Sequence, residues 1–128
     1  MPTVSFEDLQ VYQLAETLAD DVWRIVIAWD AFARDTVGKQ IVKAADSIGA
    51  NIAEGTGRGS YQDNRRFIRI ARGSLYETRH WLRRAYKRNL LSDEQISKLK
   101  PTIEGLAPKL NAYLRSIGSN RERMTNDQ

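Results

Sequence analysis

The sequence predicts an all-α protein, an antiparallel up-down-up-down four-helix bundle. Apolar residues recur at steps of three and four along most of the chain, which is the period of an amphipathic helix. Residues that cap helices precede these runs, and polar or glycine-rich turns follow them. Because the turns are short, sequential helices are expected to lie side by side and antiparallel.

The first two helices are expected at residues 6–33 and 36–54. Ser5 is interpreted as the N-cap of the first helix, because two acidic residues follow in the first turn, where the helix dipole favours negative charge. The second helix is expected to end at Gly55, a residue suited to a left-handed cap. The apolar seams predicted for these helices are Ala15, Leu18, Val22, Ile25, Trp29 and Phe32, and Val37, Ile41, Ala45, Ile48 and Ile52.

The third and fourth helices are expected at residues 61–89 and 93–117. Ser60 is the predicted N-cap of the third helix, and Ser92 opens the fourth in a capping-box pattern with Gln95. Pro101 and Pro108 fall seven residues apart on one outer face, which favours a curved or kinked single helix, with a break near Lys100 as the alternative. We expect one domain at residues 1–118 and a disordered tail at 119–128.

Composition indicates a soluble, cytoplasmic protein with a basic second half. The 128-residue chain contains no cysteine, which excludes disulfides and thiolate sites. Its first ten residues lack the apolar run of a signal peptide, and no stretch is apolar enough to span a membrane. Residues 1–60 hold 5 basic and 9 acidic residues, whereas residues 61–128 hold 15 basic and 7 acidic. This asymmetry favours an anionic partner, nucleic acid first, although it also fits solvated surface charge.

The third predicted helix carries a basic stripe within an arc of about 80°. Arginine predominates, which suits forked hydrogen bonds to phosphate, and no acidic residue interrupts the stripe. The alternative is a solvated helix face, but like charges at this spacing repel one another unless a partner neutralises them. The predicted nucleic-acid-binding residues are Arg65, Arg69, Arg72, Tyr76, Arg79, Arg83 and Lys87.

The apolar arc of the same helix spans about 160°, wider than a bundle seam needs. Its inward set is Phe67, Ile70, Ala71, Ser74, Thr78, Trp81 and Ala85. A second flank consists of Ile68, Leu75, Leu82 and Tyr86, which we interpret as an oligomer interface. The alternative is that the helix lies deep between both of its neighbours.

Catalytic chemistry is not expected. His80 is the single histidine, so histidine-based triads and most metal sites are excluded. The glycine-rich turn at residues 55–60 lacks the spacing of a phosphate-binding loop and follows a helix, where such a loop follows a strand. Ser47, Asn51, Glu54 and Arg58 form a polar stripe on the second helix without a nucleophile–base pair, which favours an interhelical hydrogen-bond network. No cofactor, metal or catalytic residue is predicted.

Two segments carry a resemblance to a known family. Residues 40–58 read QIVKAADSIGANIAEGTGR and residues 66–77 read RFIRIARGSLYE. They resemble the signatures of four-helix-bundle proteins encoded in 23S ribosomal RNA intervening sequences, a superfamily that includes accessory variability-determinant proteins of diversity-generating retroelements. The opening FEDLQVY at residues 6–12 also fits, so the resemblance covers roughly residues 5–117. The motif residues to which it gives a structural role are Gln40, Ser47, Asn51, Glu54, Gly55, Arg58, Ser74 and Glu77.

The resemblance implies a ring-like homopentamer. Its retroelement members bind nucleic acid and a reverse transcriptase through a basic outer surface. The leading hypothesis is therefore a homo-oligomeric, non-enzymatic scaffold that binds RNA or DNA through the third helix. The alternative is a protein–protein adaptor whose basic stripe docks an acidic partner, with no nucleic-acid binding.

Overall fold

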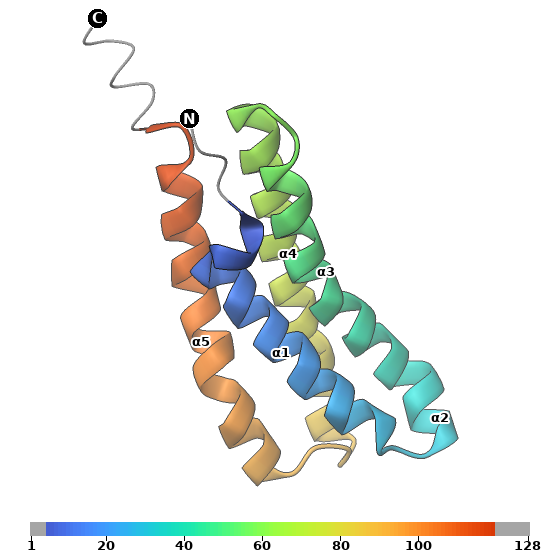
Figure 1. Cartoon of the computed structure of the whole chain (residues 1–128). Helices are drawn as coiled ribbons and strands as arrows, with labels where there is room; N and C mark the ends of the chain where they lie inside the picture. Colours follow the sequence, from blue (N-terminus) through green and yellow to red (C-terminus); the bar gives the residue numbers. More distant parts are fainter. Residues whose placement is uncertain (1–4, 120–128) are drawn as a thin grey trace, which may run out of the picture.

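Four long helices run alternately up and down in the computed structural model, which describes residues 5–119 (Figure 1). They are α1 (Gln10–Ile27), α3 (Lys39–Thr56), α4 (Tyr61–Lys87) and α5 (Asp93–Ser116). Shorter helical segments are η1 (Phe6–Asp8), α2 (Ala31–Ala33) and the π-helical turn η2 (Arg34–Gly38). No strand occurs within residues 5–119, so the predicted all-α bundle is confirmed.

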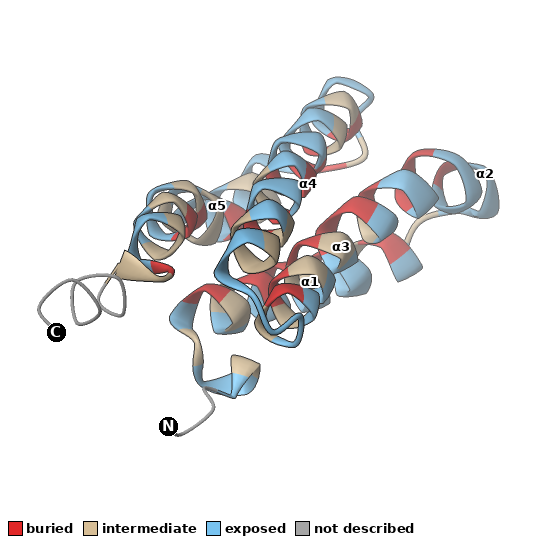
Figure 2. Ribbon diagram, turned by 90° about the horizontal axis from the view of Figure 1, so that it is seen from above, coloured by how far each residue is buried: buried red, intermediate tan, exposed pale blue. Residues whose placement is uncertain are grey.

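The four helices form a square around one core. Helix α1 packs against α3 and α5, and α4 packs against the same two helices from the opposite corner. Buried residues lie on the sides of the helices that face one another (Figure 2). The core takes its large side chains from every corner, among them Leu18, Ile48, Ile52, Leu75 and Leu106, each fully buried. Burial of these apolar side chains is the main force that holds the bundle together.

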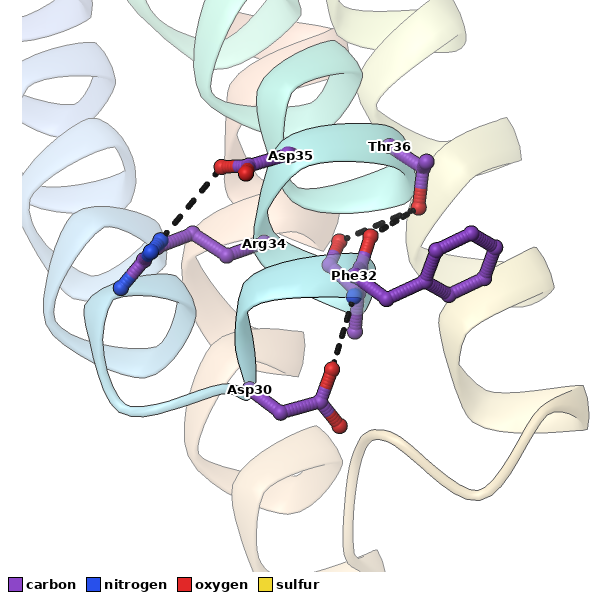
Figure 3. A network of polar contacts seen from close by, with 6 residues as sticks. Asp30, Phe32, Arg34, Asp35 and Thr36 are labelled. Atoms are coloured by element: carbon purple, nitrogen blue, oxygen red, sulfur yellow. Dashed lines mark hydrogen bonds and ion pairs between the residues drawn. The ribbon is translucent and has the colours of Figure 1, made fainter.

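The predicted boundary between the first two helices is wrong. Helix α1 ends at Ile27 instead of residue 33, and the next helix begins at Ala31 instead of residue 36. Asp30 is the N-cap, because its Oδ1 accepts a hydrogen bond from the Ala33 amide at 3.0 Å (Figure 3). Phe32, which was assigned to the seam of the first helix, instead projects from this corner and is 81% exposed.

Backbone geometry remains helical from α2 through η2 into α3. The hydroxyl of Thr36 donates to the carbonyl of Phe32 at 2.6 Å, and Arg34 and Asp35 form an exposed ion pair at 3.5 Å (Figure 3). The π-helical turn inserts a wider loop of backbone into the helix at this point. The predicted second helix therefore gains five residues, about one and a half turns, at its N-terminal end.

Substituting Asp30 with alanine should lower the free energy of unfolding by about 0.5–2 kcal/mol, because the Ala33 amide loses its cap. Chemical denaturation of both proteins measures the change. Asp35→Ala is the matched control, since it also removes one carboxylate from the same corner but breaks only an exposed ion pair. Equal losses in the two variants would contradict the capping role of Asp30.

Other helix ends agree with the predictions in part. Ser60 and Ser92 cap α4 and α5, and Ser92 and Gln95 form the full capping box. Pro101 and Pro108 both lie inside an uninterrupted α5, so the alternative of a break near Lys100 is wrong. Ser5 precedes only η1, and its hydroxyl donates to the Glu7 carboxylate instead of capping backbone.

The turn between α3 and α4 uses its glycines differently from the prediction. Gly55 lies within α3 and is buried, and Gly59 adopts the left-handed conformation with φ of 84°. A Cβ on Gly55 would lie 2.6 Å from Asn64 Oδ1 and 3.1 Å from Phe67 Cβ, so this glycine permits the close approach of α4.

Residues 120–128 of the predicted disordered tail lie outside the described residues. None of the described helices is long and apolar enough to cross a membrane.

Candidate nucleic-acid interface

Helix α4 carries the predicted basic stripe along the side of the bundle that it shares with α5. It is the longest helix, with 27 residues, and Ser60 starts it by accepting a hydrogen bond from the Asp63 amide at 3.1 Å. Apolar side chains on two flanks bury it against α3 and α5, so the stripe has a fixed direction relative to the bundle.

Two arginines of the stripe are held against α5. Arg65 donates from Nη1 to the carbonyl of Ile117 at 2.8 Å, and Arg72 donates from Nη1 to Asn111 Oδ1 at 2.8 Å. Both side chains are half-buried. The Arg65 contact satisfies a carbonyl at the C-terminal end of α5, where helices leave such groups unpaired. These two residues therefore connect α5 to α4. The exposed part of the stripe consists of its other members.

The remaining members of the stripe are exposed to solvent. The guanidinium of Arg79 lies 5.3 Å from the ring centroid of Tyr76, a cation–π contact on the surface. The exposed cations of the stripe are Arg69, Arg79, Arg83 and Lys87. Within residues 5–119, none of these four pairs with a carboxylate, although Arg58 and Arg66, elsewhere on the surface, form ion pairs at 3.3 and 3.9 Å. The structure thus presents a run of uncompensated positive charge formed by Arg69, Arg79, Arg83 and Lys87. We refer to these four residues as the α4 basic face.

Three of the four residues in the predicted apolar flank of α4 are buried. Ile68 and Leu75 are 0% exposed and Leu82 is 5% exposed, because they pack into the core of their own chain. The prediction that they form an oligomer interface is therefore wrong, and the alternative that the helix lies deep between its neighbours is correct. Ile70, assigned to the inward set, is instead 43% exposed.

Tyr86 is the exposed member of that flank. Its hydroxyl donates to Asp93 Oδ1 at 2.7 Å and so connects the end of α4 to the start of α5. This hydrogen bond raises the pKa of Tyr86, because deprotonation would place two negative charges side by side. The hydroxyl therefore remains a donor at neutral pH.

A groove of about 660 Å³ lies between α4 and α5 beside the α4 basic face. Arg79 and Arg83 line it from α4, and Lys100 and Glu104 line it from α5. Its apolar lining consists of Leu82, Tyr86, Ile96, Leu99, Ile103 and Ala107. Ile96, Leu99 and Ile103 recur at steps of three and four, the period of an apolar helix face. Their place in a groove depends on how far apart α4 and α5 stand, which periodicity does not report.

The polar stripe of the second predicted helix joins α3 to α4 at a hydrogen-bond network. The hydroxyls of Ser47 and Ser74 lie 2.9 Å apart, and Asn51 Nδ2 donates to the Ser47 carbonyl at 2.7 Å and to its hydroxyl at 3.0 Å. Thr78 donates to the Ser74 carbonyl at 2.8 Å. Because these hydroxyls have hydrogen-bond partners, their burial costs little free energy. The contacts also fix the register of the two helices.

The other motif residues lie outside this network. Glu54 and Arg58 form a surface ion pair at 3.3 Å, and the Arg58 guanidinium also lies 5.2 Å from the ring centroid of Phe67. Gln40 and Glu77 are exposed. The predicted interhelical network is thus observed for Ser47 and Asn51 but not for the Glu54–Arg58 end of the stripe.

His80 and the acidic side chains are the groups that acid–base or metal-dependent chemistry would use. His80 is exposed, and its ring meets the ring of Trp81 edge-on at 4.9 Å. Within residues 5–119, His, Asp and Glu side chains do not gather into a group of three that could hold a metal ion. The surface that the structure does assemble is basic and partly apolar, which is chemistry for binding an anion.

Comparisons with known proteins address the family and the fold separately. The model of the 23S rRNA-intervening sequence protein family matches residues 7–112. A crystal structure of a protein of unknown function from the S23 ribosomal protein family of Bacteroides thetaiotaomicron superimposes with a TM-score of 0.73. The two chains are 22% identical, and the match covers 83% of this chain and 99% of the other, a likeness that shows a shared fold. No protein of curated function matches the sequence.

Proposed function

The chain belongs to the 23S rRNA-intervening sequence protein family, and from this premise we propose that it is a non-enzymatic, homo-oligomeric scaffold that binds the phosphate backbone of RNA or DNA. The observation that carries the proposal is the α4 basic face, whose four cations are exposed and have no carboxylate partner among residues 5–119. Unneutralised like charges on one helix destabilise it, and a polyanion removes that cost. Tyr76 adds an exposed aromatic ring on which a base stacks.

Self-association in this proposal uses a surface other than the apolar flank of α4. Trp23 and Ile27 stand one turn apart on α1 and are 54% and 53% exposed, and Phe32 is 81% exposed at the neighbouring corner. Trp23 and Ile27 share one face of α1, and exposed apolar side chains of this kind favour a protein contact. The resemblance to retroelement accessory proteins extends the proposal to a pentamer and to a reverse transcriptase as partner. The same apolar residues also favour the second candidate function, a protein–protein adaptor without nucleic-acid binding.

Binding of labelled RNA and DNA across a salt series tests the proposal. The double variant Arg69→Glu/Arg79→Glu should lose about two units of the slope of log K against log salt, because each lost phosphate contact releases about one counterion fewer. Fluorescence anisotropy measures affinity, and light scattering on the same samples measures the oligomer.

Lys39→Glu/Lys43→Glu is the control, since it makes the same change in net charge on the exposed side of α3. It should leave most of the salt-sensitive binding in place. Failure of the intact wild-type oligomer to bind either nucleic acid at low salt would exclude this function and leave the adaptor.

A further inference from the structure

The groove between α4 and α5 shares two residues with the α4 basic face, namely Arg79 and Arg83. A chain whose phosphates follow that face would therefore pass directly along the rim of the groove. We infer that the groove receives unpaired bases, so that the protein binds single-stranded nucleic acid in preference to duplex. This inference rests on the proposed function and adds the class of nucleic acid to it.

The lining of the groove matches the chemistry of a base. Ile96, Ile103 and Ala107 are only half-buried, so apolar surface remains open to solvent on the α5 side. Nucleobases present flat, weakly hydrated faces that stack on apolar and aromatic side chains and on guanidinium planes. In a duplex these faces are already stacked inside the helix, and only phosphates and groove edges meet the protein. The apolar lining therefore contributes to binding only when the bases are unpaired.

The charge around the groove matches a polyanion. Arg79, Arg83 and Lys100 line it, and Glu104 is the one carboxylate among the lining residues, 3.8 Å from Lys100. The basic residues continue away from the groove to Arg69 at one end and to Lys87 at the other, over about 27 Å at the rise of an α-helix. Regularly spaced phosphates use the whole of such a run. An acidic peptide that filled only the groove would leave much of this run of basic residues without a partner. The length of the run therefore favours a nucleic-acid strand as the occupant.

The first arm of the experiment compares an unstructured oligonucleotide with a duplex of the same number of phosphates, each as RNA and as DNA. At moderate salt, the wild-type protein should bind the single strand at least about tenfold more tightly, since stacking adds to the phosphate contacts. Comparison of the RNA and DNA strands shows whether the sugar affects the affinity.

The second arm fills the groove with Ala107→Phe, which adds a large side chain without removing a charge. Affinity for the single strand should fall about tenfold, and affinity for the duplex should stay within about twofold of wild type. Ala112→Phe, on the exposed side of α5, is the matched control and should change neither affinity. Circular dichroism and thermal melting establish that both variants fold. Glu104→Gln, which removes the lining carboxylate, should raise affinity for the strand about twofold to threefold.

The outcomes separate the inference from the proposed function. Equal affinity for strand and duplex, or an unchanged strand affinity in a folded Ala107→Phe variant, overturns the groove and leaves backbone binding intact. Absence of salt-sensitive binding to every oligonucleotide overturns the proposed function itself. An acidic amphipathic peptide that binds the wild type but not Ala107→Phe, when no strand binds, assigns the groove to a protein partner instead.

Discussion

Leu75→Ala is expected to lower the free energy of unfolding by about 2–5 kcal/mol, whatever the protein concentration. Leu75 is fully buried in the core, so truncation removes apolar contacts and leaves a cavity that the surrounding helices close only in part. Urea denaturation followed by circular dichroism, at protein concentrations that differ widely, measures the loss. Independence from concentration distinguishes a residue in the core of one chain from a residue between two chains.

Ile70→Ala is the matched control on the same helix. Ile70 is 43% exposed, so its truncation should cost less than about 1 kcal/mol. Two results together would contradict the burial of Leu75 within one chain. The Leu75→Ala protein would keep the stability of the wild type at low concentration, and at high concentration it would sediment as a smaller oligomer than the wild type, which would place Leu75 at a subunit interface.

Helix ends were predictable wherever a local hydrogen bond sets them. Ser60 and Ser92 each accept a hydrogen bond from an amide three residues later, and the predicted starts at 61 and 93 agree with α4 and α5. Such caps depend on side chains within a few residues of one another, so sequence alone carries the information. The fold class followed from the period of the apolar residues for the same reason.

The corner between α1 and α3 was not predictable from spacing. Phe32 falls three residues after Trp29 and so continues the seam of the first helix, yet the chain has already reversed at Asp30. Periodicity counts residues along a helix and does not register where the helix stops. Asp30 was the available signal, because aspartate is among the preferred N-cap residues, but an acidic residue on a helix surface looks the same in the sequence.

The candidate site was predicted as a set of residues but not as a surface. A helical wheel placed Arg65 and Arg72 in the same stripe as Arg69, and the structure turns the first two toward α5 while the third stays exposed. The wheel of one helix does not include the position of its neighbour. The groove depends on the distance between α4 and α5 in the same way, so no single segment of sequence could have predicted it.

Gly38→Ala is expected to destabilise the bundle, whereas Gly73→Ala should stabilise it by up to about 1 kcal/mol. Both glycines lie in helical segments, so alanine gives each the same gain in helix propensity. An added Cβ at Gly73 meets nothing within 4 Å among the described residues. At Gly38 it would lie 2.6 Å from Val26 Cγ1 and 3.2 Å from the Ala33 carbonyl oxygen.

The steric conflict at Gly38 has no easy relief. Val26 is 4% exposed and β-branched, so its side chain has few alternative rotamers, and the Ala33 oxygen belongs to the backbone. Either α1 or the η2 turn must move, at a cost of about 1–3 kcal/mol. Because the propensity gain cancels between the two variants, the difference between their unfolding free energies isolates that cost. Equal stabilities would mean that the close approach of α1 to the π-helical turn does not restrict residue 38, and that the turn tolerates a side chain where the structure allows none.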